Sequence, residues 1–387
     1  MSSILAQVQA KASSSTRLIS LDVLRGVTVA LMIAVNNPGD SEHAFKEMRH
    51  SEWNGFTVTD LVFPAFLFIV GISIVFSFEP RLIRGEARTA VFVHSLRRAV
   101  ILFMLGLVVN GFPFFDLESL RIYGVLQRIA MCFLCVAVLY LWDHRPDHVV
   151  VMVTAILLGY WILMRWVPVP GFGLPGRDLP VLDQNGNLAA WLDRLVMPAG
   201  RLLGRTRDPE GLLSDLPSVA TTLLGLLTGL WLRTSRTLPQ KVVGMLASGA
   251  LMLVLALVWN RWFPINKNLW TSSYVLYAAG WTLLSLAFCI WAIEIKEWKR
   301  GWTTLWLVFG GNAITAYVFS ELLTSTLYAI PVHAAKGQTT LQQFLYTNIF
   351  APIGNPGFAS LLYSICFLIV CAIPIGALYR RQIYIKI

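Results

Sequence analysis

The sequence predicts an all-α integral membrane protein, a bundle of about ten transmembrane helices with both termini in the cytoplasm. Of its 387 residues, 56% are hydrophobic and only 13% are charged, and the mean hydropathy is +0.64. Apolar runs of about 20 residues recur along the chain, and a helix of that length spans a bilayer. The runs are continuous rather than alternating, which favours helices over a closed barrel.

The predicted spans divide the chain into a short polar tail and one long membrane domain. Residues 1–17 are polar and Ser-rich and lack the apolar core of a cleaved signal peptide, so we expect a cytoplasmic tail. Residues 18–387 are expected to form a single transmembrane domain. The spans lie near residues 20–37, 58–78, 91–110, 122–142, 148–166, 217–233, 242–262, 272–294, 303–328 and 358–379.

The net charge of +10 is concentrated on one predicted face of the membrane. Alternate connections carry "RLIRGEAR", "RTSRTLPQK" and "EIKEWKRG", and the chain ends in "RRQIYIK". Clusters of Lys and Arg in short loops mark the cytoplasmic side. The basic balance therefore indicates orientation in a membrane, and we expect no nucleic-acid partner. The longest connections, residues 38–57, 167–216 and 329–357, fall on the opposite, outer face, where a site would be built.

The first span carries three polar residues on one helical strip. At 100° per residue, Arg25 and Asn36 differ by about 20° and Asp22 lies within about 60° of both. Asp22 and Arg25 could simply form an i,i+3 pair at the membrane interface. Alternatively, the strip lines a wet cavity that holds a ligand, because ionisable groups inside a membrane usually mark function.

The fourth span opens with "RIYGVLQRIAMC", which places Gln127 and Arg128 inside the membrane. Arg128 lies too deep to extend easily to water, so we expect a partner such as Asp22, Asp60 or a bound anion. Arg128 could have a role in function or could form a purely structural ion pair, and both alternatives are open.

Further polar residues lie at predicted outer ends of spans. Asp215 opens the sixth span, where capping is the simpler role. The stretch "NRWFPINKNLWTSSY" fits an aromatic interface belt with Lys267 reaching water, but the belt does not explain Asn266 and Asn268. Asn312 follows two glycines in the ninth span and needs a polar partner.

His50 has the most suggestive surroundings of the six histidines. It precedes Trp53-Asn54-Gly55 and leads to Asp60. A histidine can take a proton from an amine or attack an acyl group, and a nearby carboxylate can orient its ring. An amide such as Asn36 could polarise a carbonyl. We find no G-x-S-x-G, Walker A or H-E-x-x-H motif, and His43 and His50 have no evident third ligand, so no metal is expected.

Six stretches of the chain resemble the heparan-α-glucosaminide N-acetyltransferase family. They are "SLDVLRGVTVALMIAVNNPG", "RHSEWNGFTVTDLVFPAFLFIVG", "RIYGVLQRIA", "DPEGLLSDLPSVATTLLGLLTG", "PINKNLWTSSYVLYAAG" and "GGNAITAYV", in that order over nearly the whole chain. The resemblance implies a membrane acetyltransferase that uses cytoplasmic acetyl-CoA and an amino-sugar acceptor on the far side. It also implies that His50 is the essential histidine and that Asn36 is the asparagine that ends the first core span.

These expectations assign roles to the polar residues. Asp60 is expected to orient His50, while acetyl-CoA and an amino sugar are the expected partners, in contact with membrane lipid. A homodimer and a bacterial inner-membrane location are further expectations. The groups placed nearest acetyl-CoA are Arg25, Asp22, Arg128 and Gln127, together with Arg97 and Arg98. The candidates for acceptor contacts are Asn54, Trp53, Asp215, Asn268 and Asn312.

Two alternatives from other classes remain at this stage. A transporter of amino sugars or oligosaccharides would also need polar strips and broken helices. An O-acyltransferase that modifies a surface glycan would keep the enzyme and change its acceptor.

Overall fold

The computed structural model describes residues 18–298, 301–334 and 337–385. The expected polar tail, residues 1–17, lies outside these described residues. Helices make up nearly all of the regular structure, and the only sheet within the described residues is the hairpin of β1 (Pro331–Ala334) and β2 (Gly337–Thr340). The all-α fold class is therefore confirmed.

The described chain has nine helices long and apolar enough to cross a membrane. They are α2 (Ile19–Asn36), α3 (Val58–Ile83), α4 (Arg88–Gly111), α5 (Val125–Trp142), α6 (Pro146–Trp166), α8 (Asp215–Arg233), α9 (Leu238–Trp259), α10 (Ser272–Ile290, continued by a π turn to Ile295) and α14 (Pro356–Arg380). Shorter elements connect them, including α7 (Leu188–Val196) and α13 (Leu341–Leu345). A multi-pass membrane protein accounts for this set.

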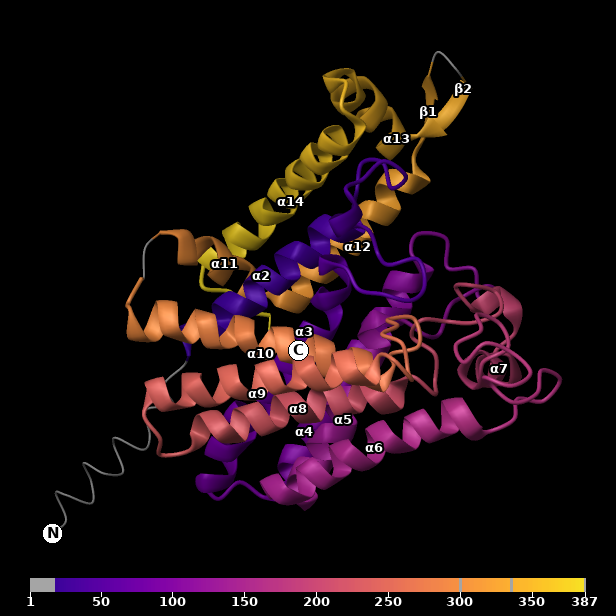
Figure 1. Ribbon diagram of the computed structural model, residues 1–387. Coiled ribbons are helices and arrows are strands. Elements are labelled where there is room, and N and C mark those ends of the chain that lie inside the picture. The colour runs from indigo at the N-terminus through magenta and orange to yellow at the C-terminus, as the bar shows by residue number, and fades with distance from the viewer. Residues whose placement is uncertain (1–17, 299–300, 335–336, 386–387) are drawn as a thin grey trace, which may run out of the picture.

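The predicted ninth span is broken. It forms α11 (Trp302–Gly311) and α12 (Ala313–Ala329), which meet at Asn312 with a bend of 80°. Counting this pair as one span gives the predicted ten. In Figure 1, α12 runs beside α2 and α14 towards α13 and the hairpin, which form the tip of an arm at the upper right.

Helix α3 lies at the centre of the bundle, and its packing against α8 positions the site. A Cβ on Gly71 of α3 would come within 1.9 Å of the Thr222 carbonyl oxygen, and one on Gly225 of α8 within 1.9 Å of the Phe68 carbonyl oxygen. Small residues allow membrane helices to approach this closely. One turn beyond Gly225, a Cβ on Gly229 would meet Val75 and Ile72, about one turn beyond Phe68. The contacts at Gly225 and Gly229 therefore advance together along both helices, so α3 and α8 run parallel and begin at the same end.

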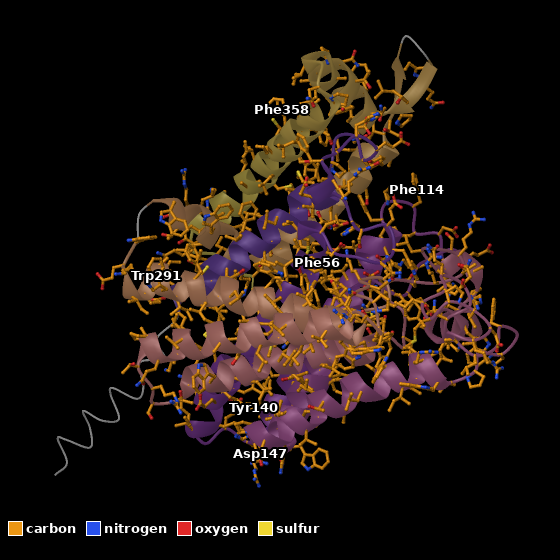
Figure 2. The ribbon with its side chains drawn as sticks, viewed as in Figure 1. Phe56, Phe114, Tyr140, Asp147, Trp291 and Phe358 are labelled. Atoms are coloured by element: carbon orange, nitrogen blue, oxygen red, sulfur yellow. The ribbon has the colours of Figure 1, made fainter. Side chains whose placement is uncertain are left out.

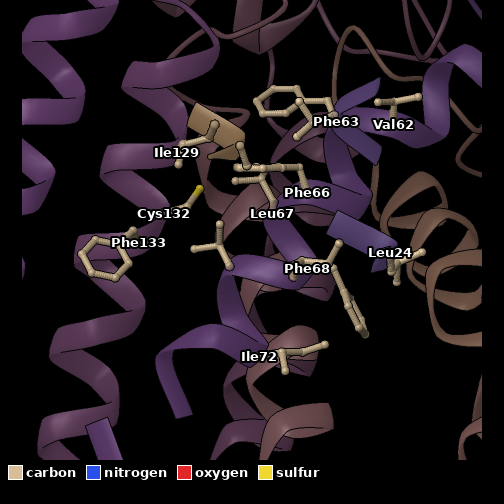
Figure 3. Close-up of a cluster of buried hydrophobic side chains, with 14 of the residues drawn as sticks. Leu24, Val62, Phe63, Phe66, Leu67, Phe68, Ile72, Ile129, Cys132 and Phe133 are labelled. Carbon is tan, nitrogen blue, oxygen red and sulfur yellow. The ribbon is translucent and has the colours of Figure 1, made fainter. Parts of the chain in front are cut away.

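Burial separates the central helices from those that face lipid. The most apolar window of α3 is 72% buried, whereas that of α9 is 22% buried. Figure 3 shows the core that surrounds α3, where Phe66 and Leu67 pack between Leu24 of α2 and the side chains of Ile129 and Cys132 on α5. A rigid centre of this kind fixes where the first turn of α3 lies.

Candidate active site

The structure joins His50 to Asp60 at the first turn of α3. The His50 Nδ1 atom lies 2.8 Å from Oδ1 of Asp60, whose side chain is fully buried. The other carboxylate oxygen accepts hydrogen bonds from the backbone N–H of Ser51, at 3.1 Å, and of Thr57, at 3.0 Å. Thr57 and Asp60 form a capping box, which is why this sequence begins a helix here. Asp60 is therefore held rigidly, and the structure brings it together with His50, the residue with which the sequence analysis paired it.

This contact sets the chemistry available to His50. With Nδ1–H donated to the carboxylate, Nε2 keeps its lone pair. The His50 side chain is 49% exposed, and the Lys267 amine lies 3.2 Å from its Nε2 atom. A carboxylate that orients a histidine in this way prepares it to accept a proton or to attack a carbonyl carbon.

Lys267 lies in the same cluster, although the sequence analysis did not place it there. Its Nζ atom lies 2.9 Å from Nδ1 and 3.2 Å from Nε2 of His50, and 3.7 Å from Oδ1 of Asp60. Burial lowers the pKa of the Lys267 ammonium, and the neighbouring Asp60 carboxylate opposes that effect. The only signal in the sequence is the dense polar stretch that contains Lys267, and an aromatic belt at the membrane interface also explains that residue.

Two backbone segments meet to bring Lys267 to His50. Gly55 N–H donates to the Ile265 carbonyl at 2.8 Å, with Gly55 in the left-handed region at φ 121°. Beside this contact, Asn266 Nδ2 donates to Asn54 Oδ1 at 3.1 Å. Asn266 is buried and its own Oδ1 accepts from Leu269 N–H. Asn268, a candidate for acceptor contacts, is half-buried two positions further on.

Aromatic side chains hold the same connection from two sides. Phe56 lies at the centre of the molecule in Figure 2 and packs edge-on against Tyr277, with 4.7 Å between ring centroids. The Trp53 indole donates to the Leu182 carbonyl at 2.8 Å, and the Arg207 guanidinium lies 4.9 Å from its ring centroid. Trp53 thus fastens the long connection before α8 to the site, and these contacts occupy its N–H and one ring face.

Arg128 pairs with Asp215, a correction to its expected partners Asp22 and Asp60. Its Nε lies 2.9 Å from Asp215 Oδ1, it also bonds the Ser214 hydroxyl, and its guanidinium lies 5.0 Å from the Trp270 ring centroid. Arg121 likewise pairs with Asp208 and Glu210. The first turns of α5 and α8 thus contact the Trp270 segment, at the same end as His50.

Arg25 lies at a different level of the bundle. It bonds Asp22 at 3.0 Å, as the i,i+3 alternative predicted, and also bonds Ser73 of α3 at 3.0 Å. Ser73 is 13 residues beyond Asp60, about 20 Å along the helix. Arg98 is close enough to Arg25 to interact electrostatically and covers the Phe133 ring, whereas Arg97 is exposed. The basic groups expected near acetyl-CoA are therefore divided between two levels, with Arg128 near His50 and Arg25 far from it.

Gln127 is buried beside Gly106 of α4. Within the described residues neither its amide oxygen nor its amide nitrogen has a hydrogen-bond partner. A ligand atom or a water molecule would satisfy them.

Asn36 and Asn312 lie apart from the His50 cluster. Asn36 ends α2, is exposed, and lies close to Glu321 on α12; no contact described for it involves His50. Asn312 sits at the break after α11, where its side chain bonds the backbone of Ile383 and Ile385 at 3.1 and 2.9 Å. Because Gly310 packs on the Asp22 carbonyl, Asn312 belongs to the opposite end of the bundle from His50.

Metal ligation is not suggested by the acidic and histidine side chains that the structure covers. Among the described residues, no group of three or more His, Cys, Asp or Glu side chains could hold a metal ion.

Comparison with known proteins identifies the family. The model of the family described as heparan-alpha-glucosaminide N-acetyltransferase, catalytic, matches residues 17–240. The heparan-alpha-glucosaminide N-acetyltransferases of Mus musculus and Homo sapiens are 32% and 31% identical to the chain, over 82% and 79% of its length. The matches cover 55% and 53% of those two proteins, so the chain spans about half the length of the curated relatives. The chain belongs to the heparan-α-glucosaminide N-acetyltransferase family.

Proposed function

We propose that the protein is a multi-pass membrane N-acetyltransferase that moves an acetyl group from cytoplasmic acetyl-CoA to the amine of glucosamine or a related amino sugar. The observation that carries this proposal is the group of His50, Asp60 and Lys267, in which a carboxylate orients a half-exposed imidazole. Family membership supports the reaction class, since both curated relatives are named as N-acetyltransferases acting on a glucosaminide.

The three side chains divide the chemistry between them. In a ternary complex, the amine attacks the thioester carbonyl, His50 Nε2 takes the proton of the amine, and the carbon–sulfur bond breaks to release the CoA thiolate. In a two-step route, Nε2 itself attacks the thioester carbonyl and the thiolate leaves. The amine then attacks the acetyl carbon, the bond from Nε2 to that carbon breaks, and the freed Nε2 takes the proton of the amine. In both routes a negative charge develops on the carbonyl oxygen, and the Lys267 ammonium is placed to stabilise it.

Trapping a labelled acetyl group distinguishes the two routes. Protein that is competent for transfer is mixed with labelled acetyl-CoA without acceptor, and His50 is examined for label. Label on His50 supports the two-step route, and its absence supports the ternary complex.

We propose the following orientation and site assignments. The Lys- and Arg-rich connections face the cytoplasm of a bacterial inner membrane, so acetyl-CoA approaches from the Arg25 end. Residues 18–387 act as one domain. Arg25, with Arg98 nearby, would bind the phosphates of acetyl-CoA. Gln127 would bind the acetyl-bearing arm of acetyl-CoA through its two unsatisfied amide atoms. Asn54 would contact the acceptor sugar, since it is exposed and bonded to Asn266, the residue before Lys267.

The central experiment measures transfer of labelled acetyl from acetyl-CoA to glucosamine by the purified chain. A labelled N-acetyl product supports the proposal. If the label instead enters a hydroxyl group of a glycan acceptor, the chain is an O-acyltransferase. If no product forms with any acceptor, the enzyme proposal is wrong.

The 80° bend between α11 and α12 favours one second candidate, an amino-sugar transporter. Broken helices near polar residues are common in transport proteins. Uptake of labelled glucosamine into proteoliposomes without acetyl-CoA would support transport, and dependence of uptake on acetyl-CoA would support the enzyme.

A further inference from the structure

The amine of Lys267 lies over the face of the His50 ring. Its Nζ atom is 2.9 Å from Nδ1 and 3.2 Å from Nε2. Within the plane of the ring, the place this close to both nitrogens is taken by Cε1 and its hydrogen, so the amine has to lie out of that plane. A primary amine is thus placed beside Nε2, the atom through which His50 acts in both proposed routes.

Lys267 stands in a connection that is anchored on both sides of it. The preceding residue, Asn266, is fully buried, and its side-chain amide donates to Asn54 Oδ1 at 3.1 Å. Three residues after Lys267, the buried indole of Trp270 donates to the Thr221 hydroxyl of α8 at 3.1 Å. The amine is therefore held near the imidazole by the fold, because the backbone that carries it is fixed.

Burial favours the reactive form of this amine. The Lys267 side chain is only 16% exposed. Burial lowers the pKa of its ammonium, although the Asp60 carboxylate opposes the effect from 3.7 Å away. A larger share of Lys267 is therefore neutral amine than of a lysine in water, and the neutral amine is the nucleophile. The acceptor of the proposed reaction is also a primary amine, so Lys267 carries the functional group that the reaction acetylates.

We propose that Lys267 is an acetyl acceptor within the enzyme itself, and that it becomes acetylated beside His50 when no amino sugar is bound. This inference rests on the proposed function and adds a modification site to it. An amine fixed beside the reacting atoms has the advantage of an intramolecular reaction. A bound amino sugar competes for the same acetyl group and so protects Lys267.

The modification uses only the groups of the proposed reaction. The Lys267 ammonium first releases one proton to solvent. The neutral Nζ atom then attacks the acetyl carbon, either in acetyl-CoA or on Nε2 of His50. A carbon–nitrogen bond forms, and the bond from that carbon to the CoA sulfur or to Nε2 breaks, so that thiolate or imidazole leaves. Nε2 takes the second proton of the amine, and Lys267 ends as an N-acetyl amide.

Acetylation of Lys267 changes the activity of the enzyme. The amide carries no charge, so it no longer stabilises the negative charge that develops on the carbonyl oxygen. Transfer by a modified molecule should fall by about 10²–10³-fold, the usual effect of losing such a group. Acetyl-CoA without acceptor should therefore inactivate the enzyme with time, and glucosamine should prevent the inactivation.

The test incubates the purified chain in detergent with labelled acetyl-CoA, with and without glucosamine, and maps the label by peptide mass spectrometry. Label is expected on Lys267, where it also blocks cleavage by trypsin, and glucosamine above its KM should reduce it. Neutral hydroxylamine removes acetyl from imidazole and not from lysine, so label on His50 in early samples is counted separately. Transfer to glucosamine, measured afterwards on the same samples, should fall in proportion to the acetylated fraction of Lys267.

Matched variants separate this reaction from chemical acetylation of any lysine. His50→Ala should lower the rate of Lys267 acetylation by at least about 10²-fold. Lys46, an exposed lysine on the connection that carries His50, should gain little label, and glucosamine should not change that amount. Lys267→Arg keeps the charge without the amine, so its own starting rate should stay constant during incubation with acetyl-CoA alone. Lys46→Arg should lose activity in that incubation as the wild type does.

Two outcomes overturn the modification site. Either active wild type leaves Lys267 unlabelled without acceptor, or Lys267 and Lys46 gain label at similar rates that glucosamine does not change. The transfer assay keeps the two proposals distinct. Wild type that acetylates glucosamine but not Lys267 refutes the modification site alone. Wild type that acetylates Lys267 in a His50-dependent manner, but acetylates no sugar, refutes the proposed function alone.

Discussion

The amine nitrogen of Lys267 lies 2.9 Å from Nδ1 and 3.2 Å from Nε2 of His50, although 217 positions separate the two residues in the chain. Asp60 lies within 3.7 Å of the same amine. An amine from the connection before α10 and a carboxylate on the first turn of α3 thus meet at one imidazole. In either proposed route of acetyl transfer, His50 acts through the lone pair of its ring.

Replacing Lys267 by methionine should lower kcat for acetyl transfer by about 10²–10³-fold, the usual effect of removing a donor that stabilises an oxyanion. The KM for glucosamine should change much less, because the amine acts mainly in the transition state. Steady-state kinetics on the purified variant would measure both. Lys46→Met removes an exposed lysine from the connection that carries His50 and is expected to retain wild-type kcat. Equal activity of the two variants would exclude a catalytic role for Lys267.

Asp60→Asn should lower the rate of acetyl transfer by about 10²–10⁴-fold. The amide can donate its N–H₂ to Nδ1 of His50, which moves the ring hydrogen to Nε2 and removes the lone pair that the reaction uses. Thr57→Ala is the comparison, since it keeps the carboxylate but removes the N-cap of the same helix and the 3.0 Å hydrogen bond from the Thr57 hydroxyl to Asp60, and it should cost about 1 kcal/mol of stability. Transfer rates and melting temperatures of both variants would be compared. If Thr57→Ala loses as much activity as Asp60→Asn, the role of the carboxylate is to stabilise the start of α3, and orienting His50 is not its role.

The Arg128–Asp215 pair is expected to support structure. Asp215→Ala leaves the guanidinium of Arg128, which is 1% exposed, without its carboxylate and should cost about 3–5 kcal/mol. Melting temperatures in detergent would measure the loss. Asp147→Ala, which breaks an exposed pair with Arg145, should change stability by less than about 1 kcal/mol. A similar small change in both variants would show that the buried pair contributes nothing.

Asp193 should make stability depend on pH between about 4 and 6. It lies on α7, outside the spans, and burial raises the pKa of its carboxyl to about 6. Because the folded state then holds a proton that the unfolded state releases, the contribution of Asp193 to stability falls as pH rises, by at most about 3 kcal/mol. The difference in stability between wild type and Asp193→Asn should therefore shift against the wild type from pH 4 to pH 7. A difference that stays constant, or shifts the other way, would contradict this.

Local patterns in the sequence predict the helices and the His50–Asp60 contact. Only ten positions separate these two residues, and Asp60 falls on the first turn of a helix whose start is marked by its own capping box. Apolar runs likewise predict each span. The break at Asn312 is not predicted, because the apolar run continues across the two glycines that precede it.

Contacts between distant segments could not be predicted in the same way. The pairing of Arg128 with Asp215 crosses 87 positions, and that of Lys267 with His50 crosses 217. Both pairs depend on how α3, α5, α8 and α10 pack. Close contacts at glycines determine this packing, and the hydropathy pattern carries no information about it. Asn36 was expected to act with His50, but it lies close to Glu321 of α12 instead.

The claim that His50 carries out acetyl transfer is tested most directly by comparing wild type with His50→Ala in the transfer of labelled acetyl from acetyl-CoA to glucosamine. Elution as a folded species in size-exclusion chromatography and an unchanged melting temperature would establish that the variant is intact. We predict that transfer by the folded variant falls by at least about 10²-fold. Transfer at the wild-type rate by folded His50→Ala would contradict the account.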